Sequence, residues 1–230
     1  MGFGTFVHHI GTLLLLVATA LLIVVDVTSP VVNRLAIMRV ELGNAVEGTD
    51  VTFGSFGFCH RGVRDSDRCS HTQIGYDPAG LMRSIDGTDF GDAAQSTSRG
   101  LTRVMILHPV ATALCFIAFL LCIGTGIVGS IGAAFFSLLS FIVTVVAMIC
   151  DFVAFSIIKN NVNDNNRSRA YWSSGIWCML AAALCTLLAA AVVLLTCCAG
   201  RSKKRREAEA KGSFSEGTTP APRRPFWKRG

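Results

Sequence analysis

The chain has 230 residues, of which 51% are hydrophobic and 16% are charged, and its mean hydropathy is +0.52. The apolar residues are concentrated in four blocks, whereas a soluble domain of this length would need a polar face on each helix. The net charge of +6 comes largely from the C-terminal end. This composition excludes a soluble globular protein and does not imply a nucleic-acid partner.

The four apolar blocks predict four membrane-spanning helices, because a helix needs about 20 apolar residues to cross the hydrocarbon core. The first block also fits the hydrophobic region of a cleaved signal peptide, but no Lys or Arg precedes Arg34, which favours a retained helix. The sequence therefore predicts an all-α membrane protein whose membrane domain covers residues 1–200. The expected spans are residues 7–27, 103–128, 131–158 and 172–199.

The distribution of basic residues predicts the orientation of these spans. Ten of the 21 Lys and Arg residues follow Gly200, and a basic segment beside a span is typical of the cytoplasmic side. Four spans then place both termini in the cytoplasm, and residues 28–102 form a long extracellular loop. The tail, residues 201–230, is polar and contains prolines, so we expect it to be a basic, disordered segment.

The long loop contains alternating aromatic and glycine residues that end at a cysteine. Residues 51–58 alternate as in a strand, and residues 69–76 are a candidate second strand. The segment "HRGVRDSD" between them is charged and typical of a turn, and residues 31–42 form a candidate third strand. The segment "DGTDFGDAAQSTSRG" is expected to be irregular or weakly helical on its return to the membrane.

Cys59 and Cys69 are the only cysteines in this loop, and an extracellular location favours a disulfide between them. The disulfide would join the strands of a hairpin that stands on the outer membrane face. The alternative is a metal site that includes His60 and His71, but the spacing fits no standard zinc pattern. The remaining cysteines lie in or beside the spans, where they are expected to pack as small hydrophobic residues.

Three ionisable residues, Asp26, His108 and Asp151, lie within or at the ends of spans, where such groups are costly. Counting along the helices places all three in one layer of the outer leaflet. A carboxylate next to an imidazole changes the pH at which the imidazole titrates, so His108 and Asp151 are a candidate pH-responsive pair. The alternative is a structural interhelical hydrogen bond. Pro109 is expected in the first turn of its helix, where a missing N–H is tolerated.

Two further sites are candidates for modification. Cys197 and Cys198 precede a basic run at the inner membrane edge, a pattern typical of palmitoylation, although a stop-transfer signal alone also explains the charges. Asn166 begins an N-x-S sequon on the expected extracellular side, so it is a candidate for N-glycosylation. Its closeness to the fourth span is the argument against this modification.

Four segments, taken in chain order, resemble one family. "VTFGSFGFC", "IGYDPAGL", "LHPVATAL" and "DFVAFSIIKNNVN" are similar to segments of the fungal PalI family of ambient-pH response regulators. The resemblance covers residues 5–200, and the whole arrangement is similar to a claudin-like bundle with a small disulfide-stapled extracellular β-sheet. The residues of the family motifs are Phe53, Gly54, Phe56, Gly57, Gly75, Tyr76, Asp77, Pro78 and Pro109.

The resemblance implies a plasma-membrane accessory protein of alkaline-pH signalling, which assists a seven-span pH sensor in assembly or surface localisation. Its partners would then be that multi-span sensor and membrane lipids, with a homo-oligomer as a further option. Many members of the family carry long cytoplasmic tails, whereas residues 201–230 follow the last span here. The alternative function is that of a claudin-like or eisosome-type membrane-organising or adhesion protein.

An enzyme is not expected, because the sequence contains no recognisable nucleophile with its base, paired carboxylates or set of metal ligands. For the same reason no cofactor is expected. A channel or transporter has little support, since the spans show neither internal repeats nor broken helices.

Overall fold

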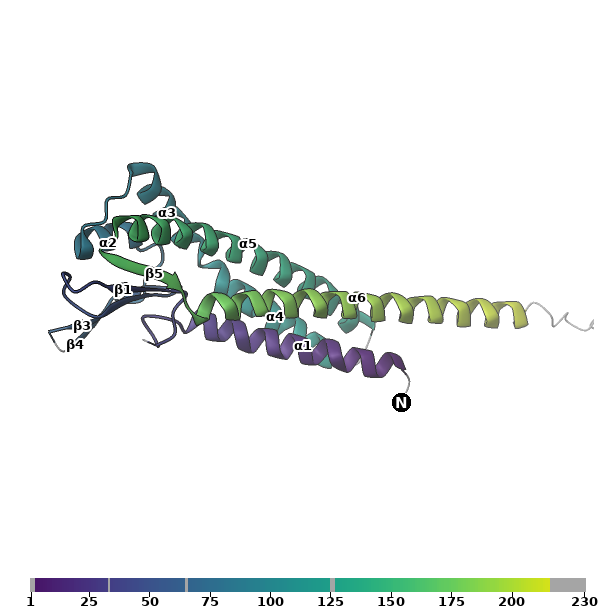
Figure 1. Cartoon of the computed structure of the whole chain (residues 1–230). Coiled ribbons are helices and arrows are strands. Elements are labelled where there is room, and N and C mark those ends of the chain that lie inside the picture. The colour runs from purple at the N-terminus through teal and green to yellow at the C-terminus, as the bar shows by residue number, and fades with distance from the viewer. Residues whose placement is uncertain (1–2, 33, 65, 125–126, 216–230) are drawn as a thin grey trace, which may run out of the picture.

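A computed structural model describes residues 3–32, 34–64, 66–124 and 127–215 and shows a helical bundle with a small sheet at one end (Figure 1). We call this the sheet-side end of the bundle. The N-terminus of the chain lies at the opposite end. The helices are α1 (Phe3–Asp26), α2 (Pro78–Asp86), α3 (Asp92–Val104), α4 (Leu107–Ile123), α5 (Ile127–Asn165) and α6 (Ser174–Ser215), and the strands are β1 (Met38–Leu42), β2 (Asp50–Phe53), β3 (Phe58–Val63), β4 (Ser66–Cys69) and β5 (Ser168–Trp172).

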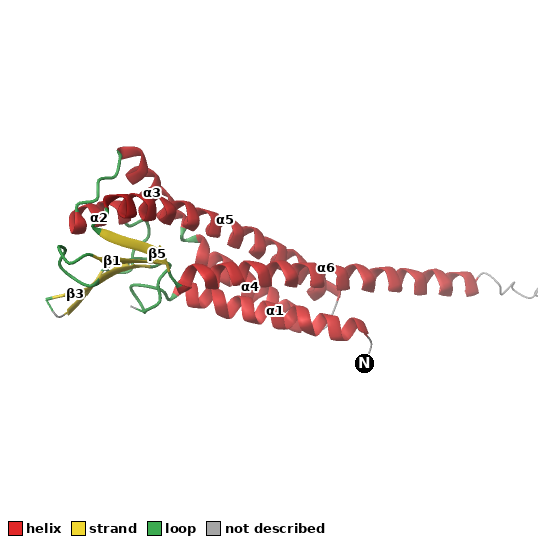
Figure 2. Ribbon diagram, in the orientation of Figure 1, coloured by secondary structure: helices red, strands yellow, loops and turns green. Residues whose placement is uncertain are grey.

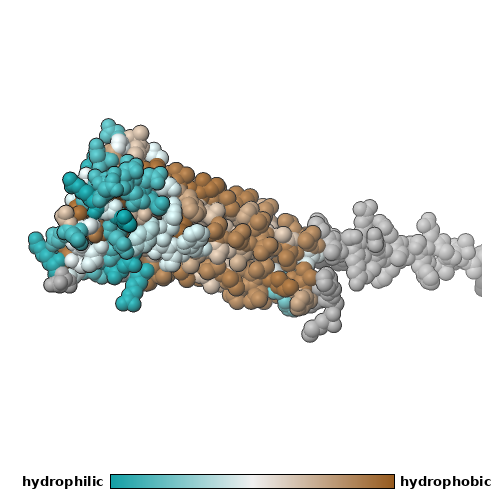
Figure 3. Space-filling model, viewed as in Figure 1, coloured by the Kyte–Doolittle hydropathy of each residue, from teal (hydrophilic) through white to brown (hydrophobic). Residues whose placement is uncertain are grey.

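Four helical stretches are long and apolar enough to cross a membrane, which confirms the predicted four-span bundle. They are Phe6–Asp26, Asp92–Ile123, Ile131–Asn165 and Ser174–Thr196. Figure 3 shows an apolar surface over the bundle and a hydrophilic surface over the sheet-side end. Large side chains such as Phe135 and Leu195 are exposed on the bundle surface, as expected where the surrounding medium is lipid.

The bundle interior is lined mainly by small side chains, so the helices approach one another closely. At Gly11 of α1, an added Cβ would lie 3.0 Å from Val192 Cγ1 of α6, which shows how close these two helices are. Close packing without large side chains is how membrane helices gain van der Waals contact when both the interior and the lipid are apolar. The small buried residues of this interior are Ala18, Ala111, Cys115, Ala118, Cys122, Ala133, Ala134, Ala182 and Ala189.

The sheet has the strand order β4-β3-β2-β1-β5 with antiparallel pairs throughout. Val40 of β1 is paired with Val51 of β2 and with Ala170 of β5, and these three side chains are buried on one face. This face packs on α5 through residues such as Ile158 and Val162 (Figure 2). With 39 residues, α5 is about 58 Å long, which exceeds the roughly 30 Å hydrocarbon core. Its C-terminal part therefore extends beyond the core, where it packs against the sheet.

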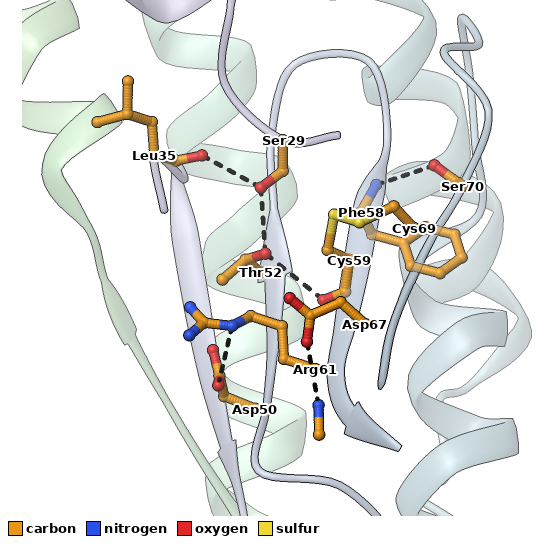
Figure 4. The surroundings of a disulfide bond; sticks show 11 residues. Ser29, Leu35, Asp50, Thr52, Phe58, Cys59, Arg61, Asp67, Cys69 and Ser70 are labelled. Carbon is orange, nitrogen blue, oxygen red and sulfur yellow. Dashed lines mark hydrogen bonds and ion pairs between the residues drawn. A yellow bond between two sulfur atoms is a disulfide. The ribbon is translucent and has the colours of Figure 1, made fainter. Parts of the chain in front are cut away.

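The predicted disulfide is present and joins neighbouring strands of the sheet (Figure 4). Cys59 of β3 is directly opposite Cys69 of β4, with a Cα–Cα distance of 4.0 Å. The residues that flank the disulfide, Phe58 and Ser70, are also in contact, because Phe58 N–H donates to Ser70 Oγ at 3.1 Å. The disulfide therefore closes the hairpin at the end away from its turn.

The strand boundaries around the disulfide differ from those expected. Residues 51–58 do not form one continuous strand with alternating side chains. A tight turn separates β2 from β3, and it is closed by a hydrogen bond from Gly54 N–H to Gly57 O. Gly54 is required there, since an added Cβ would lie 2.1 Å from Ser29 O. The charged segment expected to be a turn instead forms parts of β3 and β4, and β4 precedes Cys69 rather than following it. Only Met38–Leu42 of the expected third strand pairs in the sheet.

One helix, α2, and one strand of the sheet-side end were not expected. Asp77 caps α2 by accepting from Gly80 N–H at 2.9 Å, Pro78 occupies its first turn, and Gly87 ends it in the left-handed region. The return to the membrane, expected to be irregular or weakly helical, contains α3, a helix whose 13 residues are mostly polar. The structure also continues α6 to Ser215, which places residues 201–215 of the expected disordered tail in a helix.

The unexpected strand, β5, comes from the short connection between α5 and α6. Asn163 of α5 holds its outer edge, because its side-chain amide accepts from Ala170 N–H at 2.8 Å and donates to Ala170 O at 3.2 Å. The connection therefore contributes an edge strand to the sheet instead of a free loop.

Candidate functional site

A buried group of polar side chains lies in the bundle near its sheet-side end, and we call it the polar cluster (Asp26, His108, Thr112 and Asp151). His108 of α4 and Asp151 of α5 face each other, with Nε2 of the imidazole 3.3 Å from Oδ1 and 3.1 Å from Oδ2. Their side chains are 0% and 1% exposed. The structure thus brings together the two residues that were proposed as a pair from the sequence.

Asp26, at the end of α1, joins the same cluster through α4. Thr112 Oγ1 lies 2.7 Å from Asp26 Oδ2 and 3.0 Å from His108 O, one helical turn earlier. Asp26 and His108 are also close enough to interact electrostatically. The cluster therefore links three helices, α1, α4 and α5, by polar contacts within an otherwise apolar bundle.

The polar cluster has hydrogen-bonding capacity that the described residues do not use. His108 Nδ1 and Asp26 Oδ1 are buried and have no hydrogen-bond partner among the residues placed by the structure, and the two oxygens of Asp151 share the one contact with His108 Nε2. Each buried polar atom left unpaired costs about 1–3 kcal/mol. Because such atoms are rare in native proteins and costly in lipid, the polar cluster is the strongest candidate site of the chain.

The family motif around Tyr76 lies directly on the sheet side of the polar cluster. Tyr76 is fully buried, its hydroxyl donates to Gly54 O at 2.8 Å, and Thr102 Oγ1 donates to Tyr76 O at 2.7 Å. Its ring stacks on Phe53 at a centroid distance of 6.5 Å, and the charge of Asp151 acts on it. Tyr76 therefore connects the turn after β2, the end of α3 and the cluster.

Both tyrosines of the chain predict a loss of stability at alkaline pH. Burial, and then the charge of Asp151, raises the pKa of Tyr76 well above its usual value, while burial and a hydrogen bond to Glu41 raise the pKa of Tyr171 to about 12. A phenol that holds its proton more tightly in the folded chain stabilises the fold below its unfolded pKa of about 10. This stabilisation is lost as the pH rises above that value towards the folded pKa.

We therefore expect the melting temperature of the purified chain to fall between about pH 10 and pH 12, and the fall to be smaller in Tyr76→Phe. Thermal unfolding in detergent at stepped pH values measures it. Tyr171→Phe serves as the matched comparison, since this side chain is much less buried than that of Tyr76. A profile of Tyr76→Phe that parallels the parent chain would contradict the role given to burial of this phenol.

The other residues selected from the sequence are distributed around the fold. Pro109 lies in the first turn of α4. His60 Nε2 lies 2.9 Å from Glu47 O, and no group of three His, Cys, Asp or Glu side chains suited to a metal occurs in the described ranges. Asn166 is exposed at the turn between α5 and β5. The side chains of Cys197 and Cys198 lie outside the part of the chain that the structure describes.

Two contributors to the site were not selected from the sequence. Thr112 follows His108 by four residues, so helical periodicity places both on one face of α4 and could have indicated it. Thr102 lies on α3 and bonds to the backbone of Tyr76, and no sequence pattern indicates such a long-range contact to a carbonyl.

Comparisons with known proteins agree with this architecture. A model of the SUR7/PalI family matches residues 6–189. The chain is 30% identical over 144 residues to the pH-response regulator protein palI/prr-5 of Neurospora crassa, which covers 63% of this chain and 19% of that protein. It is 29% identical over 144 residues to the pH-response regulator protein palI/RIM9 of Pyricularia oryzae, with 63% and 18% covered.

The chain thus aligns with about a fifth of the length of the curated relatives that it matches. The family match itself begins in α1 and ends in α6, so it covers the first three spans and most of the fourth. The resemblance that the motifs around Tyr76 and Pro109 indicated is confirmed at the level of the family. By its match over most of its length, this chain belongs to the SUR7/PalI family.

Proposed function

We propose that this protein is an accessory membrane component of a fungal response to ambient alkaline pH, and that it assists the assembly or surface localisation of a multi-span pH sensor. The names of two curated relatives as pH-response regulators support a role in this response. The structural observation that carries the proposal is the buried His108–Asp151 contact, which joins α4 to α5 next to Tyr76 of the family motif.

In the proposed orientation, the sheet-side end faces the exterior of the plasma membrane and both termini are cytoplasmic. The Cys59–Cys69 disulfide supports this, because disulfides persist in oxidising compartments. The ten basic residues after Gly200 support a cytoplasmic tail. The N-terminus lies at the end away from the sheet, as this topology requires (Figure 1).

The polar cluster provides a way for pH to act on the bundle. With a protonated imidazole, His108 and Asp151 form an ion pair, whereas a neutral imidazole leaves a weaker hydrogen bond. A change in protonation would alter how firmly α4 is held on α5. Asp26 from α1, Tyr76 from the loop before α2 and Cys150 beside Asp151 are the other titratable groups near the pair.

Complementation tests the proposed function. We expect this chain to restore growth at alkaline pH to a fungal strain that lacks its own PalI protein, and a seven-span protein to co-purify with it from membranes. If growth is not restored although the chain reaches the cell surface, the pH-response role is contradicted. Co-purification with components of cortical membrane domains instead would favour the membrane-organising alternative.

Variants of the cluster separate signalling from packing. Asp151→Asn and His108→Phe are each expected to weaken the alkaline response at unchanged surface levels. Thr186→Ala is the matched control, because this buried hydroxyl donates within its own helix at 2.9 Å and lies outside the cluster. Normal responses from both cluster variants would show that the pair only packs the helices.

A further inference from the structure

A cleft of about 410 Å³ lies between the start of α2 and the exposed face of α3. Arg99 and Arg103, one helical turn apart on α3, both line it. Neither guanidinium has an ion-pair or hydrogen-bond partner among the residues that the structure describes, whereas the other wall includes the carboxylate of Asp77. The cleft therefore presents two guanidiniums without a direct partner and, on its other side, the carboxylates of Asp77 and Asp92.

Residues of the family motif build one wall of this cleft. Asp77 Oδ2 accepts from Gln95 Nε2 at 2.8 Å, which fixes the start of α2 against α3. Gly75 has a φ of 74°, in the left-handed region, and an added Cβ would lie 2.4 Å from Arg103 Cγ. Gly75 thus provides both the turn and the space that the stem of Arg103 occupies. The motif shapes the cleft as well as the hydrophobic contacts of Tyr76.

The position of the cleft along the helix places it at the membrane surface. Residues 104–123, from the last residue of α3 through α4, contain no Asp, Glu, Lys or Arg, and 20 helical residues span about 30 Å, the thickness of the hydrocarbon core. Arg103 therefore lies at the edge of the core, and Arg99 lies about 6 Å farther out. Both guanidiniums are at the depth of lipid phosphates. This argument holds whichever side of the membrane the sheet faces.

The charges of the lining residues favour one class of headgroup. Guanidinium groups bind phosphate oxygens in a bidentate manner, so Arg99 and Arg103 suit a phosphodiester. Asp92 begins α3, and Asp77 is bonded to Gln95 near the same end, so both carboxylates lie farther from the core than the arginines. They would repel a second negative charge and attract a cation. A carboxylate offers about four lone-pair sites, and the contacts with Gly80 N–H and Gln95 Nε2 leave capacity on Asp77 for a further donor.

We propose that this cleft binds the headgroup of an amine-bearing phospholipid. The phosphodiester lies between Arg99 and Arg103, and the ammonium group donates to Asp77. Binding at this place would anchor α3 to the membrane surface through residues that the family motif positions.

Native mass spectrometry of the detergent-purified full chain tests this proposal. The probes are short-chain phosphatidylethanolamine, short-chain phosphatidylglycerol and inorganic phosphate. We expect phosphatidylethanolamine to bind at least about tenfold more tightly than either of the others, because only it satisfies both sets of charges. The double variant Arg99→Gln, Arg103→Gln is expected to lose about tenfold or more of this affinity.

Asp77→Asn tests the ammonium contact separately, because Asn is an equally good helix N-cap and keeps the start of α2 intact. This variant is expected to bind phosphatidylethanolamine and phosphatidylglycerol equally. The control is Arg68→Gln, which removes an exposed arginine from β4 and should leave binding unchanged.

Three results would overturn the proposal. The first is unchanged phosphatidylethanolamine binding in the double arginine variant, which would place the lipid elsewhere. The second is inorganic phosphate that binds as tightly as phosphatidylethanolamine, which would make the cleft a site for free phosphate. The third is equal binding of the two lipids by the parent chain, which would remove the role of the amine.

Discussion

Replacement of Asp151 by Leu is expected to destabilise the bundle by about 3–5 kcal/mol, the usual cost of breaking a buried polar pair by removing one partner. His108 is 0% exposed and has no other side-chain hydrogen bond within the described ranges, so Leu would leave its ring nitrogens unpaired. Asp151→Asn keeps an acceptor oxygen near His108 Nε2 and should cost only about 1–2 kcal/mol. Thermal unfolding of the purified chain in one detergent at fixed pH compares the two variants.

The double variant His108→Leu, Asp151→Leu provides the control for this comparison. Removing both partners leaves neither the imidazole nor the Asp151 carboxylate unpaired, and an apolar replacement of a buried pair is often neutral or stabilising. We therefore expect the double variant to be more stable than Asp151→Leu alone. Equal losses for the Leu and Asn variants would contradict a stabilising contact between these side chains.

Removal of the disulfide by Cys59→Ala, Cys69→Ala is expected to cost the hairpin about 2–3 kcal/mol, because the bridge closes a loop of about ten residues in the unfolded chain. The effect should be confined to β3 and β4, since β1, β2 and β5 have their own pairings and pack on α5. Hydrogen exchange followed by mass spectrometry measures this as faster exchange in residues 58–70, with little change in the spans.

Cys115→Ala is the matched control for the disulfide variant, because it removes a buried free thiol from the bundle interior. It should leave exchange in the hairpin unchanged. Non-reducing mass mapping of the parent chain must also find Cys59 linked to Cys69. Two free thiols in protein taken from the cell surface would argue against both the linkage and the extracellular placement of the sheet.

The spans were predictable because the lipid environment imposes one simple requirement on them. Twenty or so consecutive apolar residues are needed, whatever the packing partners are, and hydropathy alone detects them. His108 and Asp151 could be selected on the same basis, since ionisable groups within an apolar run are rare and costly. Their contact could not be derived from spacing, because it depends on how α4 and α5 are rotated against each other.

The sheet-side end was less predictable because its elements are short and depend on tertiary contacts. The sequence "SRAYW" becomes β5 only because β1 and Asn163 are available to hydrogen-bond it. Asp77 and Pro78 are typical of a helix start as well as of a turn, and here they start α2. The turn that separates β2 from β3 depends on the close approach of Gly54 to Ser29, which sequence periodicity does not show.

The side-chain amide of Asn163 also affects how copies of this protein behave when they are crowded in one membrane. An unpaired strand edge is a template on which another chain can add a strand and start aggregation. At β5, the outward N–H and C=O of Ala170 are already occupied by Asn163. At the opposite edge, β4 is only four residues long and carries Asp67 and Arg68, both exposed. Short length and charge discourage strand addition there, so we expect Asn163→Ala to expose an edge and promote self-association at high expression.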